Sequence, residues 1–133
     1  MKKERIYTDL VSEPAPGLWS NAMKVGNILY LSGFTARAND GVTITGKDEY
    51  EQAVFIFKKF KAYVEAAGGE MDDIVKMTIF VTNMANNRKV WEARREFFKD
   101  DFPACTLVEV SGLANPEILI EIEGIAHIGC NKG

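Results

Sequence analysis

The sequence has little of what metal centres and disulfide frameworks need. It contains two cysteines and one histidine in 133 residues. Cys105 lies inside an apolar run and Cys130 lies close to the C-terminal end, so the cysteines lack the spacing of a zinc site or of a disulfide scaffold. We therefore expect reduced thiols, no metal site and no metal catalysis.

An excess of positive charge and long apolar runs are also missing. The formal net charge is −3 and the pI is near 5.2, whereas nucleic-acid affinity depends on clustered Lys and Arg. Glu4, Arg5 and Asp9 interrupt the N-terminus where a signal peptide needs an apolar run, and no stretch approaches the roughly 20 apolar residues of a membrane span. We expect a cytoplasmic protein with no nucleic-acid or membrane partner.

The composition that remains is that of a globular chain. Hydrophobic residues make up 47% and charged residues 26% of the sequence, which is enough to bury a core. Residues 1–133 are therefore expected to form a single domain.

The first half of the chain predicts a hairpin followed by a long helix. Two apolar runs in 23–32 flank Gly26-Asn27, a dipeptide suited to a tight turn. Apolar residues recur at helical spacing over 49–67, and Asp48 is a good N-cap with a glutamate three residues later. Lys58, Lys59 and Lys61 are interpreted as a solvated helix face, because the protein is acidic.

The second half predicts a strand over 75–82, a helix over 88–98, and two strands over 104–111 and 118–128. We expect the last two strands to form a hairpin centred near Ala114. The element order fits a mixed sheet with both helices on one face. The other sheet face then needs a cover, so we expect an oligomer.

Two carboxylates share one face of the last predicted strand, because Glu121 and Glu123 are two residues apart. The expected hairpin register places Leu107 opposite Glu121 and Cys105 opposite Glu123. A carboxylate on such a face either pairs with a cation of a neighbouring chain or holds a water or a substrate proton. Spacing alone favours the structural role, although desolvation would raise the pKa of the carboxyl and suit acid–base chemistry.

Several short motifs, each weak alone, resemble the RidA/YjgF family in order and spacing. They run from about residue 15 to residue 126 and include KVGNILYLSG (24–33), EAAGG (65–69), DDIVKMTIFV (72–81), FF (97–98), FPA (102–104), VEV (108–110) and IEIEGIA (120–126). The resemblance implies an α+β, chorismate-mutase-like fold with a mixed six-stranded sheet and two helices on one face. It also implies a homotrimer with a central barrel and ligand clefts between subunits.

The resemblance further implies a cofactor-free hydrolysis of reactive imines, the tautomers of enamines such as 2-aminoacrylate, to a keto acid and ammonia. Glu121 matches the family glutamate that orients the water, and the backbone carbonyl of Leu107 matches its partner. Ser32 and Gly33 match the segment that lines the cleft, and Trp19 stands where the family usually has tyrosine.

Three positions depart from the family pattern. Cys105 follows Pro-Ala at the position where the deaminases have an arginine. That arginine binds the substrate carboxylate through a planar bidentate contact, which a thiol cannot make. Trp91 replaces a family asparagine, and 34–37 (FTAR) lacks the usual glutamine and proline. The predicted cleft is therefore more apolar and differently shaped.

Cys105 has three interpretations. As a nucleophile it would need an orienting base, and His127 is the only histidine. Alternatively, another cation replaces the lost arginine, the candidates being Arg37, Arg88 and Arg94. The third interpretation, a ligand without a carboxylate at this point, is the one we favour from the sequence.

Two functions follow from these positions. The first is a deaminase of a small imine or enamine that uses Glu121 and the Leu107 carbonyl to position water. The second is a non-catalytic protein that binds a small metabolite in the cleft as a sensor or as the partner of an enzyme. The retained Glu121 favours the first function, and the missing arginine favours the second.

Overall fold

The computed structural model describes residues 1–133, which form six strands and two helices joined by loops and two short 3-10 turns. The strands are β1 (Lys3–Arg5), β2 (Ala22–Val25), β3 (Ile28–Phe34), β4 (Ile74–Val81), β5 (Ala104–Glu109) and β6 (Ile120–His127). The helices are α1 (Glu49–Ala66) and α2 (Asn87–Phe97). Each predicted helix and strand is present, with ends that differ by one to two residues.

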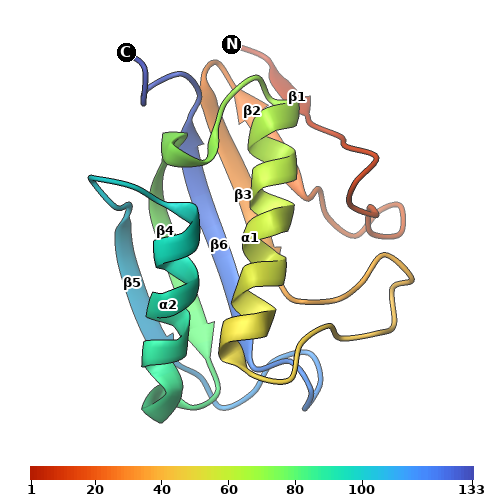
Figure 1. Cartoon of the computed structure of the whole chain (residues 1–133). Helices are drawn as coiled ribbons and strands as arrows, with labels where there is room; N and C mark the ends of the chain where they lie inside the picture. Colours follow the sequence, from red (N-terminus) through yellow and green to blue (C-terminus); the bar gives the residue numbers. More distant parts are fainter.

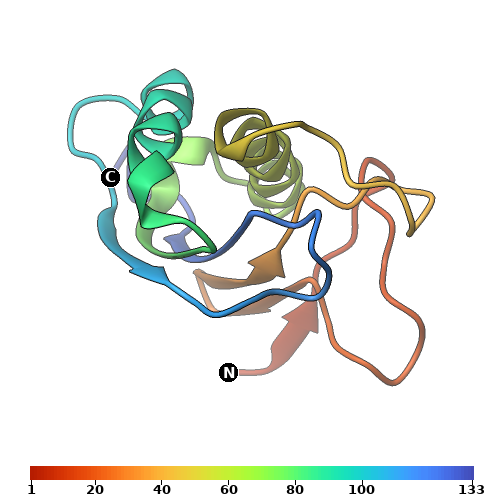
Figure 2. The same ribbon diagram turned by 90° about the horizontal axis from the view of Figure 1, so that it is seen from below.

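All six strands belong to one sheet in the order β1-β2-β3-β6-β4-β5. Only β4 and β5 run parallel, and the other neighbours are antiparallel. Both helices lie over the same face of the sheet (Figures 1 and 2). The predicted α+β architecture, a mixed six-stranded sheet with two helices on one face, is confirmed.

Helix α1 begins where the sequence predicts. The side chain of Asp48 accepts a hydrogen bond from the Glu51 backbone N–H at 2.9 Å, which satisfies one of the free donors of the first turn. The Glu51 carboxylate accepts from the Lys47 N–H at 2.8 Å, so it caps the residue before the N-cap. The inner face of α1 packs Phe57, Phe60 and other apolar residues onto the sheet.

The predicted hairpin between the last two strands is wrong. Strand β5 pairs in parallel with β4, and β4 lies between β5 and β6. The chain passes from β4 through α2 to a parallel β5, because a helix of this length returns the chain to the same end of the sheet. Leu107 is therefore paired with Ile79, and Glu121 is paired with Phe80.

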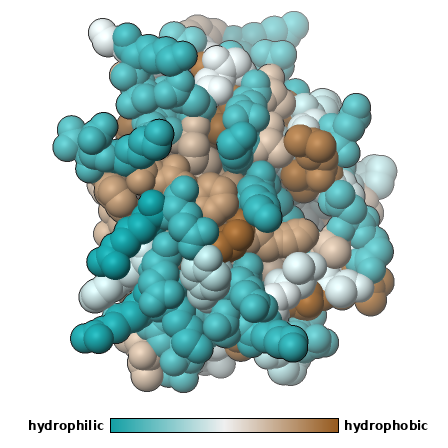
Figure 3. Space-filling model, in the orientation of Figure 1, coloured by the Kyte–Doolittle hydropathy of each residue, from teal (hydrophilic) through white to brown (hydrophobic).

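The face of the sheet away from the helices mixes apolar and polar side chains. Tyr30 and Val108 are exposed there, and Phe80 and Ile125 are half-buried. Lys76, Thr78 and the two carboxylates Glu121 and Glu123 share the same face. In contrast, the helix-bearing side of the molecule presents a mostly hydrophilic surface (Figure 3). The exposed apolar side chains of the open face are the ones that self-association would bury.

No helix of the chain combines the length and the apolar character that crossing a membrane requires.

Candidate functional site

A cavity of about 400 Å³ lies where β3 and β6 meet three loops. Its lining comprises Trp19, Ser32, Gly33, Thr35, Arg37, Ala114 and Glu121. Four residues predicted for the site, Trp19, Ser32, Gly33 and Glu121, therefore line one cavity. Its volume lies within the range of small-molecule sites.

Gly33 holds the Glu121 carboxylate against the backbone of β3. A Cβ at Gly33 would lie 3.0 Å from Glu121 Cδ and would clash with Glu121 Oε2. The pairing of β3 with β6 also shifts by one residue between Leu31 and Phe34, which is a bulge at this point. The bulge and the missing side chain together leave room for the carboxylate to lie on the strand.

The protein environment favours the neutral form of Glu121. Burial raises the pKa of this carboxyl above its ordinary value, and the negative charge of Glu123 on the same strand face adds to the shift. A carboxyl with a raised pKa takes up a proton more readily near neutral pH. Glu121 is thus suited to accept and return a proton.

Trp19 is fixed on the cavity wall although 56% of its surface is exposed. Its indole Nε1 donates to Asn21 Oδ1 at 3.1 Å. The buried Asn21 amide donates in turn to the Ser12 carbonyl at 3.1 Å and to the Tyr63 hydroxyl at 2.9 Å. Asn21 was missed from the sequence because a single asparagine in a loop carries no pattern.

The Ser32 hydroxyl is also engaged, donating to the Ser20 carbonyl at 2.6 Å. This bond ties β3 to the loop that carries Trp19. The oxygen of the hydroxyl keeps lone pairs that can accept from a ligand.

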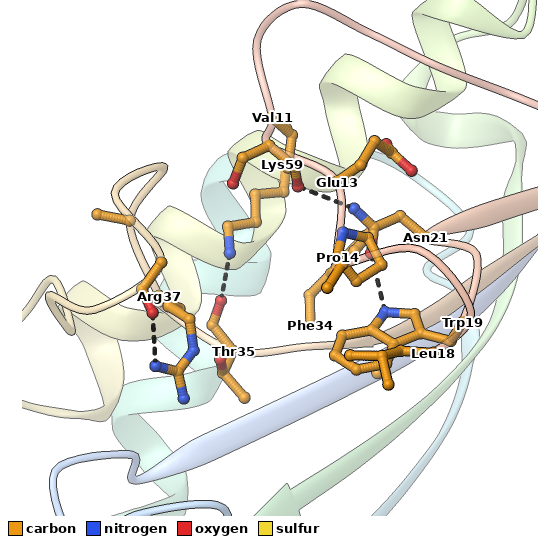
Figure 4. Close-up of a pocket in the computed structure, with 15 residues that line it drawn as sticks. Val11, Glu13, Pro14, Leu18, Trp19, Asn21, Phe34, Thr35, Arg37 and Lys59 are labelled. Carbon is orange, nitrogen blue, oxygen red and sulfur yellow. Dashed lines mark hydrogen bonds between the residues drawn. The ribbon is translucent and has the colours of Figure 1, made fainter.

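A second cavity of about 390 Å³ adjoins the first and shares Trp19, Gly33, Thr35 and Arg37 with it. Figure 4 shows the Lys59 ammonium and the Arg37 guanidinium near Thr35, with Leu18 and Trp19 across the cavity. The prediction that Lys59 belongs to a solvated helix face is wrong. Lys59 is half-buried, and its ammonium donates to the Thr35 carbonyl at 2.7 Å.

Lys59 extends over the side of Phe34 and Phe55 instead of pointing into water, with its Nζ 5.8 Å and 5.3 Å from the two ring centroids. A lysine stem packs along apolar surface while its charged end seeks polar partners. Lys58 and Lys61 remain exposed, as predicted.

The other predicted residues, Trp91, Cys105 and Leu107, lie elsewhere in the chain. Trp91 is on α2, and Cys105 and Leu107 are on the edge strand β5, with α2 above this edge of the sheet (Figure 1). None of the three lines either cavity. The predicted pairings of Leu107 with Glu121 and of Cys105 with Glu123 are therefore wrong within one chain.

The physical reason is the position of β4. Cys105 and Leu107 pair with Met77 and Ile79, and they pack against the core under the helices. Glu121 lies on β6, which is separated from β5 by β4, and its side chain points to the open face. Its pairing partner on β4 is Phe80. The only histidine, His127, pairs with Ile28 at the far end of β6, so it does not orient the Cys105 thiol.

Fold and cavity together define a class of protein: a small chorismate-mutase-like α+β chain with a carboxylate-bearing cavity beside a bulged strand. A model of the family described as Endoribonuclease L-PSP matches residues 11–128. The chain therefore belongs to this family, also known as RidA/YjgF.

Named relatives fall in the same group. The chain is 40% identical over 129 residues to the 2-iminobutanoate/2-iminopropanoate deaminase of Dermatophagoides farinae, covering 95% of this chain and 97% of that protein. It is 36% identical to YyfA of Yersinia pestis, a Rid family protein of unknown function, with a TM-score of 0.86 over 96% of this chain and all of that one. It is 28% identical to the structure of E. coli TdcF with bound serine, with a TM-score of 0.83 over 93% and 98% of the two chains.

Proposed function

We propose that the protein is a hydrolytic deaminase of a small imine or enamine and that its active site forms between two subunits of a homotrimer. The observation that carries this proposal is the Glu121 carboxylate, which lies on Gly33 in a cavity and has a raised pKa. The similarity to a named imine deaminase over nearly the whole of both chains supports the same chemistry.

The separation of the predicted residues supports a shared site. One subunit supplies Trp19, Ser32, Gly33 and Glu121 from its cavity. The neighbouring subunit supplies the Leu107 carbonyl and the Cys105 and Trp91 side chains from its β5–α2 edge. Association through the open face and the edge strand buries apolar surface, which also covers the unpaired β5 edge.

The reaction needs a positioned water and two proton transfers from that water to the imine nitrogen. Glu121 and the Leu107 carbonyl of the partner subunit hold a water against the imine carbon. As the water oxygen bonds to this carbon, Glu121 accepts a water proton and then delivers it to the nitrogen. Glu121 next takes the remaining hydroxyl proton and passes it to the nitrogen as the carbon–nitrogen bond breaks, so imine and water give a carbonyl compound and ammonia.

The decisive experiment measures ammonia release from freshly generated 2-aminoacrylate and from a neutral imine. Wild-type protein is expected to accelerate at least one of the two, whereas Glu121→Gln should reduce turnover by about 100-fold or more without changing the oligomeric state. Full activity in Glu121→Gln would show that the site is assigned wrongly.

A second candidate function is the binding of a small metabolite without turnover. Cys105 favours it, because its side chain packs partly on the core and offers no charge for a substrate. The bound serine of E. coli TdcF gives an example of a family member holding a small amino acid. Tight binding of a metabolite together with no ammonia release from either imine would establish this alternative.

A further inference from the structure

Two cations face the joined cavities beside Trp19, and neither forms an ion pair within the chain. Arg37 lines both cavities, and Lys59 lines one of them. Glu13, the carboxylate in the same lining, is engaged by Arg5 at 2.7 Å and by the Tyr63 hydroxyl.

Most hydrogen-bond donors of the two cations are unused. Arg37 donates once, from Nη1 to the Gly41 carbonyl at 3.1 Å, although a guanidinium has five N–H groups. Lys59 donates one of its three N–H groups, to the Thr35 carbonyl. The remaining donors can bind an anion in the cavities.

The backbone that carries Arg37 is held in place. The Ala38 N–H donates to the Thr43 carbonyl at 2.7 Å, and residue 37 forms a bridge with Ile44. Asp40 closes the turn by accepting from the Thr43 hydroxyl and from the Val42 and Thr43 N–H groups, and these bonds, together with the nearby Arg37 charge, lower the pKa of its carboxyl to about 2. Asp40 is therefore occupied by the turn, and Arg37 projects from a fixed position.

Placing two like charges beside a partly desolvated cavity costs free energy unless an anion enters. Burial and the nearby Arg37 charge lower the pKa of Lys59 to about 8. A bound carboxylate would offset both effects, because it pairs with Arg37 and favours the charged lysine.

We propose that Arg37, assisted by Lys59, binds the carboxylate of an anionic imine whose reacting carbon lies beside Glu121. This inference rests on the proposed function and assigns the residue that selects an anionic imine over a neutral one, with Leu18 and Trp19 placed to contact the rest of the substrate. In this arrangement Arg37 takes the role that an arginine at position 105 has in the family pattern. Cys105 therefore no longer implies a ligand without a carboxylate. Arg88 and Arg94, the other candidates from the sequence, line neither cavity.

Binding of the product-like 2-oxobutanoate to the intact oligomer tests this inference by a route that does not require turnover. Its affinity, measured by NMR titration, is compared with that of the neutral 2-oxobutanamide. Wild type should bind the carboxylate at least about tenfold more tightly than the amide, and Arg37→Gln should abolish the difference. Arg37→Lys keeps the positive charge and should retain most of the difference in affinity between the acid and the amide.

The exposed Lys58 on α1 provides a control, because Lys58→Gln removes the same charge at a residue that lines neither cavity. Equal affinity of wild type for the acid and the amide, or an acid preference that survives in Arg37→Gln, would overturn the inference. A loss of the preference in Lys58→Gln as large as in Arg37→Gln would also overturn it, since the effect would then be one of net charge. Absence of imine turnover alongside an Arg37-dependent acid preference would instead overturn the proposed function and leave the anion site standing.

Discussion

The cavity around Glu121 and the edge formed by β5 and α2 differ in how tightly their residues are held. Around Glu121, a bulge, a glycine in close contact and several hydrogen bonds fix the carboxylate and Trp19. At the edge, Cys105 makes one long contact from its sulfur to the Thr106 carbonyl at 3.9 Å, and 40% of the Trp91 surface is exposed.

Under the proposed function, this difference separates the residues that transfer protons from the residues that contact the ligand. A proton-transfer group tolerates little displacement, so the residues around Glu121 constrain one another. Cys105 is only partly buried at the margin of the core and Trp91 is exposed, so substitutions at these two positions cost less packing than substitutions of fully buried residues. The departures at Cys105 and Trp91 would, under the proposed function, alter the ligand contacts and leave the Glu121 carboxylate in place.

After the loss of the Glu121 carboxylate itself, the largest expected effect comes from the contact between Gly33 and Glu121. Gly33→Ala should reduce turnover by about tenfold or more, because the new Cβ displaces the carboxylate from the strand. Ammonia release by the purified oligomer measures this. Gly112→Ala is the control, since a Cβ there meets nothing within 4 Å. Wild-type turnover in Gly33→Ala would contradict the view that activity depends on the close fit of the Glu121 carboxylate against β3.

An intermediate effect is expected when the cation that binds the substrate carboxylate is moved from position 37 to position 105. Cys105→Arg in the Arg37→Gln background should recover about tenfold in kcat/KM for 2-aminoacrylate relative to Arg37→Gln alone. The arginine at 105 would then grip the carboxylate from the neighbouring subunit. Cys105→Gln in the same background controls for size, and an equal recovery with glutamine would contradict the role of charge.

The smallest expected effect concerns stability and pH. The raised pKa of Glu121 means that folding favours its protonated form, so its contribution to stability is present below the ordinary value of 4.5 and is lost as the pH rises through the folded-state pKa. Glu121→Gln should therefore raise Tm relative to wild type by roughly 2 °C at pH 7 and by less at pH 4.

Thermal unfolding at the two pH values checks this difference. The exposed Glu92 on α2 is the control, and Glu92→Gln should shift Tm equally at both. A larger gain for Glu121→Gln at pH 4 than at pH 7 would contradict the direction of the pKa shift.

Local patterns in the sequence predicted most of the fold. The turn at Gly26-Asn27, the cap at Asp48 and the alternation over 75–82 each depend on residues close in the chain, and each is present. The joining of Trp19, Ser32, Gly33 and Glu121 in one cavity was predicted from the family pattern.

Contacts between residues that are far apart in the sequence could not be predicted from local patterns. Two strands joined by a short loop suggest a hairpin, but β5 gains its hydrogen bonds from β4, which precedes it by a helix. Lys59 likewise looks like one of several surface lysines until the loop carrying Thr35 folds over its helix. Neither contact leaves a local signal.

The central claim is that one active site takes residues from two subunits, and a mixing experiment tests it most directly. Glu121→Gln disables the cavity, and Cys105→Glu should disable the edge by repelling an anionic substrate from the neighbouring subunit. Each variant alone should be inactive. Co-expressed in equal amounts, they should regain about a quarter of wild-type ammonia release, because one cleft in four combines two intact halves. No recovery in oligomers proven to contain both variants would contradict the shared site.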